Sequence, residues 1–134
     1  MSATRTAAAA ALAAALALPA AAQDGPSAGE QEYMNSCASC HGAEGRGDGP
    51  LADLMTVEVP DLTGIAARND GAFPFEEVFM IIDGRTGVRG HGYPMPVWGS
   101  RYEEAAAEHG PYGQEVVVRG RILSLVRHLE QIQE

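Results

Sequence analysis

Five consecutive residues, Cys37-Ala38-Ser39-Cys40-His41, place two thiols three positions apart and an imidazole directly after the second thiol. The chain holds only these two cysteines, which excludes a scaffold of several disulfides. C-x-x-C-H is the signature of covalent haem attachment. Each thiol forms a thioether with one vinyl group of the haem, and His41 then lies beneath the iron as its proximal ligand. In a chain of this composition the pattern arises by chance on the order of once in 2000. The sequence therefore predicts one haem c, attached through Cys37 and Cys40.

The same two cysteines allow three other interpretations. A structural zinc site needs four nitrogen or sulfur ligands, and the other histidines, His91, His109 and His128, are scattered. A thioredoxin-type pair usually lies in a βαβ unit, which the sequence lacks. A disulfide is natural in an exported chain, but it leaves His41 without a role. Haem attachment is favoured because it uses all three residues of the motif.

The first 22 residues have the pattern of a secretory signal peptide. A short start with one charge at Arg5 is followed by an apolar run from Ala7 to Leu18 and by the small residues Ala20-Ala21-Ala22. The apolar run has 12 residues, whereas a helix that spans a bilayer needs roughly 20. The alternative is an alanine-rich helix of the mature domain. We expect cleavage after residue 22, export to the periplasm, and a single domain over residues 23–134 without a membrane span.

The mature chain is strongly acidic. Its 112 residues hold 18 Asp and Glu against 8 arginines, a net charge of −10, and there is no lysine. Nucleic acid and anionic membranes would repel such a chain, so neither is expected as its main partner.

Apolar periodicity and helix-end signals predict four helices. Apolar residues at Val118, Ile122, Leu125, Leu129 and Ile132 form one stripe, which predicts a helix over 114–133. Ser27 and Glu30 form a capping box for a helix that runs to about Cys37. The other two helices are expected over 75–82, between Pro74 and Gly84, and over 101–108, stopped by Gly110-Pro111. Segments 42–70 and 84–99 lack periodicity, and loops of this length usually serve a function. A haem against which they pack would explain them.

Several motifs extend beyond the haem-attachment signature. They are Gly29, Tyr33 and Cys37 at intervals of four, Gly42 and the run Gly45-Arg46-Gly47-Asp48-Gly49-Pro50, the run Pro60-Asp61-Leu62-Thr63, and the segment Met95-Pro96-Val97-Trp98-Gly99. With these motifs the mature chain resembles the monohaem class I c-type cytochromes of the bacterial periplasmic type. The resemblance implies a small all-α fold of four or five helices, with long loops wrapped around one covalent haem. It also implies that the N- and C-terminal helices cross, with Leu125 and Leu129 as the partners of Gly29 and Tyr33 and with His128 where relatives often carry an aromatic. A methionine is implied as the distal ligand. Pro50 resembles the family's proline whose carbonyl receives the ring proton of His41.

Four methionines and three histidines of the mature chain are candidates for the distal position. Met34 lies one turn before Cys37, so it cannot reach the opposite face of the haem. Met80 is expected in the core of its helix, and nothing specific supports Met55. Met95 is favoured because Pro94 and Pro96 stiffen the backbone on both sides of a soft thioether. His91, between two glycines, is the main rival.

Four further side chains are candidates for contacts with the haem or its propionates. Tyr93 and Trp98 bracket Met95 and carry polar groups on aromatic rings, although simple core packing is an equal alternative. Arg85 and Arg89 precede Met95, and a guanidinium can hold a propionate through two hydrogen bonds. Surface exposure is the ordinary alternative for each arginine.

These features predict an exported, soluble electron carrier that shuttles single electrons between redox proteins. No catalytic triad, carboxylate dyad or phosphate loop is found, so we do not expect an enzyme. The acidity predicts a redox partner with a basic docking surface. Two alternatives stay open: a haem subunit of a larger dehydrogenase or oxidase, and a haem sensor or enzyme with an open sixth position.

Overall fold

Helices supply all the regular structure of the residues that this computed structural model describes, 25–87 and 95–134. The signal peptide expected at residues 1–22 lies outside these ranges. The α-helices are α2 (Ala28–Ser36), α3 (Ala38–His41), α4 (Phe75–Asp83), α5 (Trp98–Ala105) and α6 (Gly110–Gln131). Three short 3-10 helices are η2 (Ala52–Leu54), η3 (Ala67–Asn69) and η4 (Ala107–His109). The predicted all-α class is confirmed.

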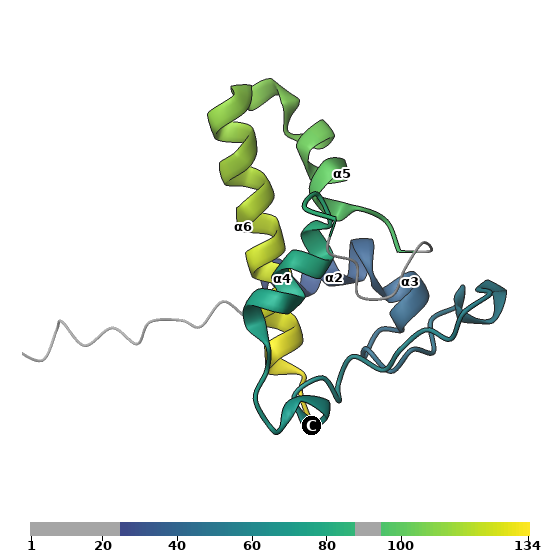
Figure 1. Cartoon of the computed structure of the whole chain (residues 1–134). Helices are drawn as coiled ribbons and strands as arrows, with labels where there is room; N and C mark the ends of the chain where they lie inside the picture. Colours follow the sequence, from purple (N-terminus) through teal and green to yellow (C-terminus); the bar gives the residue numbers. More distant parts are fainter. Residues whose placement is uncertain (1–24, 88–94) are drawn as a thin grey trace, which may run out of the picture.

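Helix α6 is the central helix of the fold, because α2, α4 and α5 all pack against it (Figure 1). Its predicted stripe is confirmed, since Val118, Ile122 and Leu125 are fully buried and Leu129 is nearly so. Ile132 packs against the edge of the same core. Burial of this stripe is the main stabilising contribution that the sequence encodes for α6.

The predicted crossing of the first and last helices is also present. The hydroxyl of Ser27 accepts a hydrogen bond from the backbone N–H of Glu30 at 3.1 Å and so caps α2. At the second position of α2, Gly29 lies so close to α6 that a Cβ atom there would be 2.1 Å from the carbonyl oxygen of Ser124. The Tyr33 ring lies 5.0 Å from the ring of His128. Ser124 and His128 are therefore the nearest neighbours at the crossing, whereas Leu125 and Leu129 lie in the adjoining core.

Two helix boundaries differ from those predicted. Helix α6 begins at Gly110 rather than near residue 114, and Pro111 lies in its first turn. The first backbone N–H groups of a helix have no partner within it, so a proline in the first turn favours a helix start. Gly110-Pro111 was predicted only to stop the preceding helix. That helix, α5, begins at Trp98 instead of residue 101 and is followed by η4.

Helix α4 and the long loops follow the prediction more closely. Pro74 precedes α4 and Gly84 ends it in a left-handed conformation with φ of 65°. Between α3 and α4, only η2 and η3 interrupt the loop, and the loop extends away from the helices at one side (Figure 1).

The helix crossing can be tested with two glycine-to-alanine changes. Gly29→Ala places a methyl group against the Ser124 carbonyl, so the free energy of unfolding should fall by about 1–3 kcal/mol. Gly120→Ala in α6 is the matched control, because a Cβ there meets no atom within 4 Å. Its higher helix propensity should raise the free energy of unfolding by up to about 1 kcal/mol. Chemical denaturation measures both, and equal effects of the two changes would contradict the close crossing.

Candidate functional site

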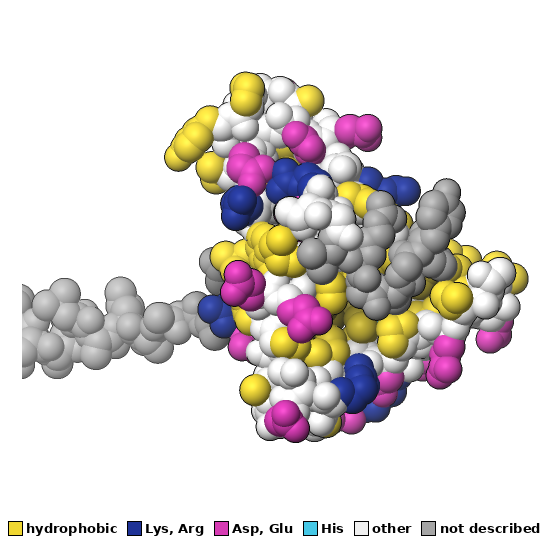
Figure 2. Space-filling view, in the orientation of Figure 1, with side chains coloured by type: hydrophobic (Ala, Val, Ile, Leu, Met, Phe, Trp, Pro, Cys, Tyr) yellow, Lys and Arg dark blue, Asp and Glu magenta, His cyan; other side chains and the backbone are white. Residues whose placement is uncertain are grey.

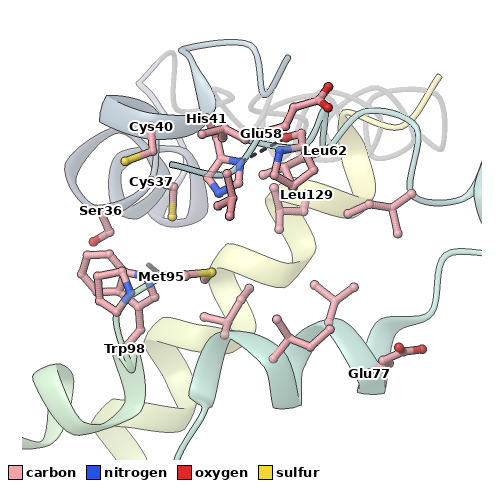
Figure 3. A pocket seen from close by; sticks show the side chains of 18 of the residues that line it. Ser36, Cys37, Cys40, His41, Glu58, Leu62, Glu77, Met95, Trp98 and Leu129 are labelled. Carbon is pink, nitrogen blue, oxygen red and sulfur yellow. Dashed lines mark hydrogen bonds between the residues drawn. The ribbon is translucent and has the colours of Figure 1, made fainter. Parts of the chain in front are cut away.

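A cavity of about 400 Å³ lies between α3, α4, the start of α5 and the long loop that follows α3. Cys37, Cys40 and His41 line it on one side, and Met95 and Trp98 line it on the other. Figure 3 shows the Met95 sulfur on the opposite side of the cavity from His41, with the Cys37 sulfur pointing between them. The structure thus brings together the two cysteines, the histidine and the methionine that the sequence singled out.

Helix α3 has only four residues, too few to be stable alone, so other parts of the chain hold it. The following loop turns back and donates three backbone hydrogen bonds to its last carbonyls. Leu51 donates to Ser39 at 2.9 Å, Gly49 donates to Cys40 at 3.1 Å, and Gly47 donates to His41 at 2.8 Å. The loop therefore fixes the backbone of the C-x-x-C-H motif.

The His41 ring is oriented by a hydrogen bond to the Pro60 carbonyl, at 3.2 Å from Nδ1. A carbonyl oxygen only accepts, so the bond requires the proton on Nδ1 and places the lone pair of the neutral ring on Nε2. His41 is 7% exposed. The prediction that Pro50 supplies this carbonyl is wrong. Pro50 is exposed and lies between Gly49 and Leu51, two of the three loop residues that bond back to α3, whereas the chain returns to the His41 ring only at Pro60.

The two cysteines are free thiols in this structure. Burial raises the pKa of the Cys37 thiol to about 12, and the charge of Glu32 adds to the effect. In the described part of the chain, no cluster of three or more His, Cys, Asp or Glu side chains could hold a metal ion.

The other methionines occupy different places. Met34 is 50% exposed on α2, and Met80 lines a separate shallow groove beside Phe75. Met55, in contrast, lines the same cavity as Met95. No sequence pattern favours Met55, because its place depends on the course of a loop without periodicity.

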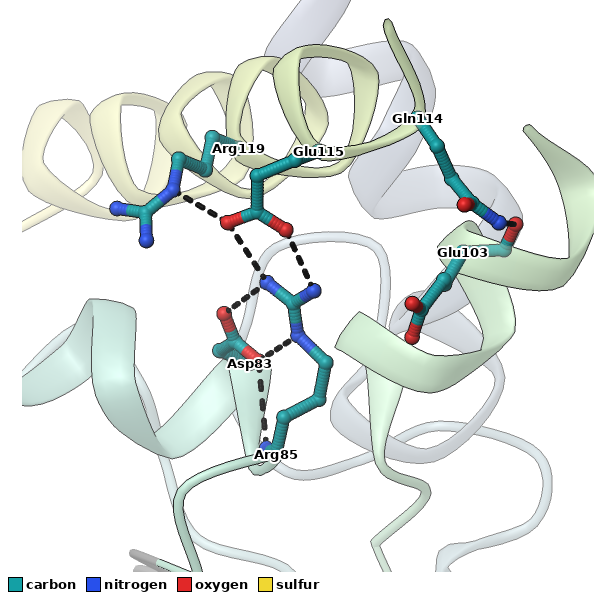
Figure 4. A network of polar contacts seen from close by, with 6 residues as sticks. All are labelled: Asp83, Arg85, Glu103, Gln114, Glu115 and Arg119. Atoms are coloured by element: carbon teal, nitrogen blue, oxygen red, sulfur yellow. Dashed lines mark hydrogen bonds and ion pairs between the residues drawn. The ribbon is translucent and has the colours of Figure 1, made fainter. Parts of the chain in front are cut away.

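The remaining residues that were predicted to contact the haem or its propionates differ in where they lie. Trp98 lines the cavity, whereas Arg85 does not and instead binds Asp83 and Glu115 (Figure 4). Tyr93, Arg89 and the rival ligand His91 lie outside the described residues. Most of the apolar lining was not predicted from the sequence; it comprises Leu62, Ile65, Val78, Ile81, Ile82 and Leu129 among others. Of these, Val78, Ile82 and Leu129 could have been found from their helical stripes.

The lining suits a haem. It combines two thiols at the vinyl-attachment spacing, an imidazole whose Nδ1 is already bonded, a thioether across the cavity, and mostly apolar walls that exclude water. These residues could hold such a group, with Cys37 and Cys40 at its edge and the His41 and Met95 side chains on opposite faces.

Comparison with known proteins gives one match. The family model described as Cytochrome c matches residues 26–108, more than half of the chain. That segment holds the attachment motif, the His41–Pro60 hydrogen bond and Met95. No curated protein and no solved structure matches the chain, and no described helix is long and apolar enough to cross a membrane. The chain belongs to the cytochrome c family, whose members bind haem c, with its iron, covalently and transfer electrons.

Proposed function

We propose that this protein is an exported one-electron carrier whose haem c is attached through Cys37 and Cys40 and ligated by His41 and Met95. The observation that carries the proposal is the placement of His41 and Met95 on opposite sides of one apolar cavity, with both thiols beside His41. An imidazole and a thioether in these positions leave no open site on the iron for a substrate.

The bound haem supplies the one-electron couple, and the residues around it set the conditions. The Pro60 carbonyl holds the His41 ring in one orientation and makes its other nitrogen a better donor. The thioether of Met95 favours the reduced state and so raises the potential. The apolar walls exclude water and keep the surroundings unchanged during electron transfer. None of these roles moves a proton, and so we propose a carrier and not an enzyme.

Replacing Met95 by alanine tests the distal ligand. The visible spectrum of the oxidised holoprotein should lose its methionine–iron charge-transfer band, and the reduced protein should bind carbon monoxide rapidly. The potential should fall, because the thioether no longer favours the reduced state.

Two other methionines serve as controls for this test. Met80→Ala should keep the band, since Met80 lies outside the cavity, and Met55→Ala should keep it although Met55 lines the cavity. Loss of the band in Met55→Ala but not in Met95→Ala would show that Met55, and not Met95, is the distal ligand. Rapid binding of carbon monoxide to the unchanged protein would favour the sensor with an open sixth position.

The partner that we propose has a basic docking surface. The loop that forms one wall of the cavity, residues 44–61, carries five acidic residues against a single arginine; the acids are Glu44, Asp48, Asp53, Glu58 and Asp61. That arginine, Arg46, is itself paired with Glu44 and Glu134. Arg85 is likewise paired with carboxylates, so neither arginine offers an unpaired positive charge at the rim.

Small redox ions of opposite charge test this acidic surface. Oxidation of the reduced protein by the hexaammineruthenium(III) cation should slow as salt rises, and oxidation by the hexacyanoferrate(III) anion should accelerate. Glu58→Gln should weaken the salt dependence for the cation more than Glu108→Gln, because Glu58 lines the cavity and Glu108 lies in η4. Stopped-flow rates measure both. Equal salt dependence for the two ions would refute electrostatic steering.

The export that we propose rests on residues 1–22 and is tested in a Gram-negative host. The full chain should reach the periplasm with Gln23 as its first residue, as determined by cell fractionation and mass spectrometry. A variant without residues 2–22 should remain in the cytoplasm. A full-length chain that retains its first residues in the cytoplasm would contradict the proposal.

A second candidate is a permanent subunit of a larger redox complex, and one surface favours it. On α6, Tyr112, Val116 and Leu123 are 86%, 54% and 45% exposed. At the helical period these residues share one face, opposite the buried stripe. Figure 2 shows hydrophobic side chains over this end of α6. A stable complex recovered under gentle purification, and lost on Val116→Asp, would establish the subunit, whereas a monomer would favour the free carrier.

A further inference from the structure

A network of charged side chains joins the end of α4 to α6. Asp83, the last residue of α4, is 5% exposed, and its Oδ1 accepts from the Arg85 Nε at 2.6 Å. Its Oδ2 accepts from Nη2 of the same arginine at 2.8 Å. The Arg85 Nη1 also donates to Glu115 of α6 at 2.8 Å, and Glu115 in turn binds Arg119 (Figure 4). The hydrogen bonds from Arg85 hold the pKa of Asp83 below its usual range, so both groups are charged at neutral pH.

The same network forms the surface on which α5 begins. A Cβ atom at Gly99 would be 2.3 Å from the Asp83 Oδ1 and 2.7 Å from the Arg85 Nε. Only a residue without a side chain fits so closely against the ion pair. Two residues before Gly99, Val97 contacts Gly84, since a Cβ atom at Gly84 would lie 3.3 Å from the Val97 side chain. The start of α5 is thus packed on residues 83–85, with Val97 against Gly84 and Gly99 against the Asp83–Arg85 pair.

The first turn of α5 has no side-chain cap. Its N-cap residue is Val97, which makes no capping hydrogen bond through its side chain. A helix without a cap leaves its first N–H groups without a side-chain partner, which weakens the definition of its start. The position of the first turn of α5 therefore depends on packing: Trp98 packs on Tyr102 and against the core, and Gly99 packs on the charged network.

Met95 and Trp98, which line the cavity, lie immediately before or at this start. Between them Pro96 restricts the backbone, so a displacement of Gly99 is transmitted to Met95 over a short, stiff segment. Burial of an ion pair adds little net stability, and its best-attested benefit is to fix one arrangement. The geometry points to Asp83, Arg85 and Glu115 as positioning residues that hold the start of α5 so that the Met95 thioether reaches the iron. This inference rests on the distal role proposed for Met95.

Competition by imidazole for the distal position tests the inference in the holoprotein. Asp83→Asn and Glu115→Gln should each weaken the methionine–iron charge-transfer band and raise the affinity for added imidazole about 10- to 100-fold, the usual effect of removing a group that supports a metal ligand. Glu115→Gln is the milder change, because the Glu115 side chain is 40% exposed. The midpoint potential should fall in both variants.

The ion pair between Arg127 and Glu130 provides a control. Its carboxylate side chain is 38% exposed, close to the 40% of Glu115, and its Nη1–Oε2 distance is 2.7 Å. Both residues lie on α6, and Arg127 packs on Phe75, at the opposite end of α4 from Asp83. Glu130→Gln should keep the charge-transfer band and leave imidazole affinity within about twofold of the unchanged protein.

Three outcomes would contradict the inference, and one of them would also contradict the distal role of Met95. Unchanged band and imidazole affinity in both Asp83→Asn and Glu115→Gln would overturn the inference, as would an equal rise in affinity in Glu130→Gln. If the unchanged protein already binds imidazole as tightly as Met95→Ala, the distal role of Met95 fails, and the positioning role fails with it.

Discussion

The rest of the structure depends on how the backbone of the four-residue helix α3 is held. Such a short helix cannot satisfy its own carbonyl groups, and the loop from Gly47 to Leu51 satisfies three of them. Because the C-x-x-C-H motif requires two thiols and an imidazole in fixed relative positions, the motif needs this external support. The main role of the long loop is therefore to support the haem-attachment motif. This role explains why the loop lacks the apolar periodicity of a helix.

Tyr33 joins this local arrangement to the helical scaffold. Its hydroxyl donates to the Gly42 carbonyl directly after α3 at 2.7 Å, and its ring packs on His128 of α6. The close approach at Gly29 brings α2 near enough to α6 for both contacts to form. The crossing of the first and last helices thus sets the position of the haem-attachment motif relative to the core. A change in how the two helices cross would therefore alter the position of His41, even without a direct contact between His41 and the crossing.

The sequence predicted what depends on local pattern and missed what depends on the course of the loops. Helices α2, α4 and α6 were foreseen, because capping residues and apolar periodicity act over a few residues. The start of α6 was misplaced, since Pro111 is compatible with both the end of one helix and the beginning of the next. The carbonyl that orients His41 was assigned to Pro50 instead of Pro60, and the partner of Arg85 was not foreseen. Both contacts join residues far apart in the sequence, His41 with Pro60 and Arg85 with Glu115.

The two sides of the cavity are held by different kinds of interaction. On the His41 side, backbone hydrogen bonds and the Pro60 carbonyl act within one continuous segment of chain. On the Met95 side, the described residues are held through α5, whose start has no side-chain cap and packs on a charged network from two other helices. Backbone bonds within one segment persist while that segment is folded, whereas contacts between helices are lost when the helices separate. The distal side should therefore open at a lower free-energy cost than the proximal side, and the lifetime of the methionine bond should depend on α4, α5 and α6 remaining together.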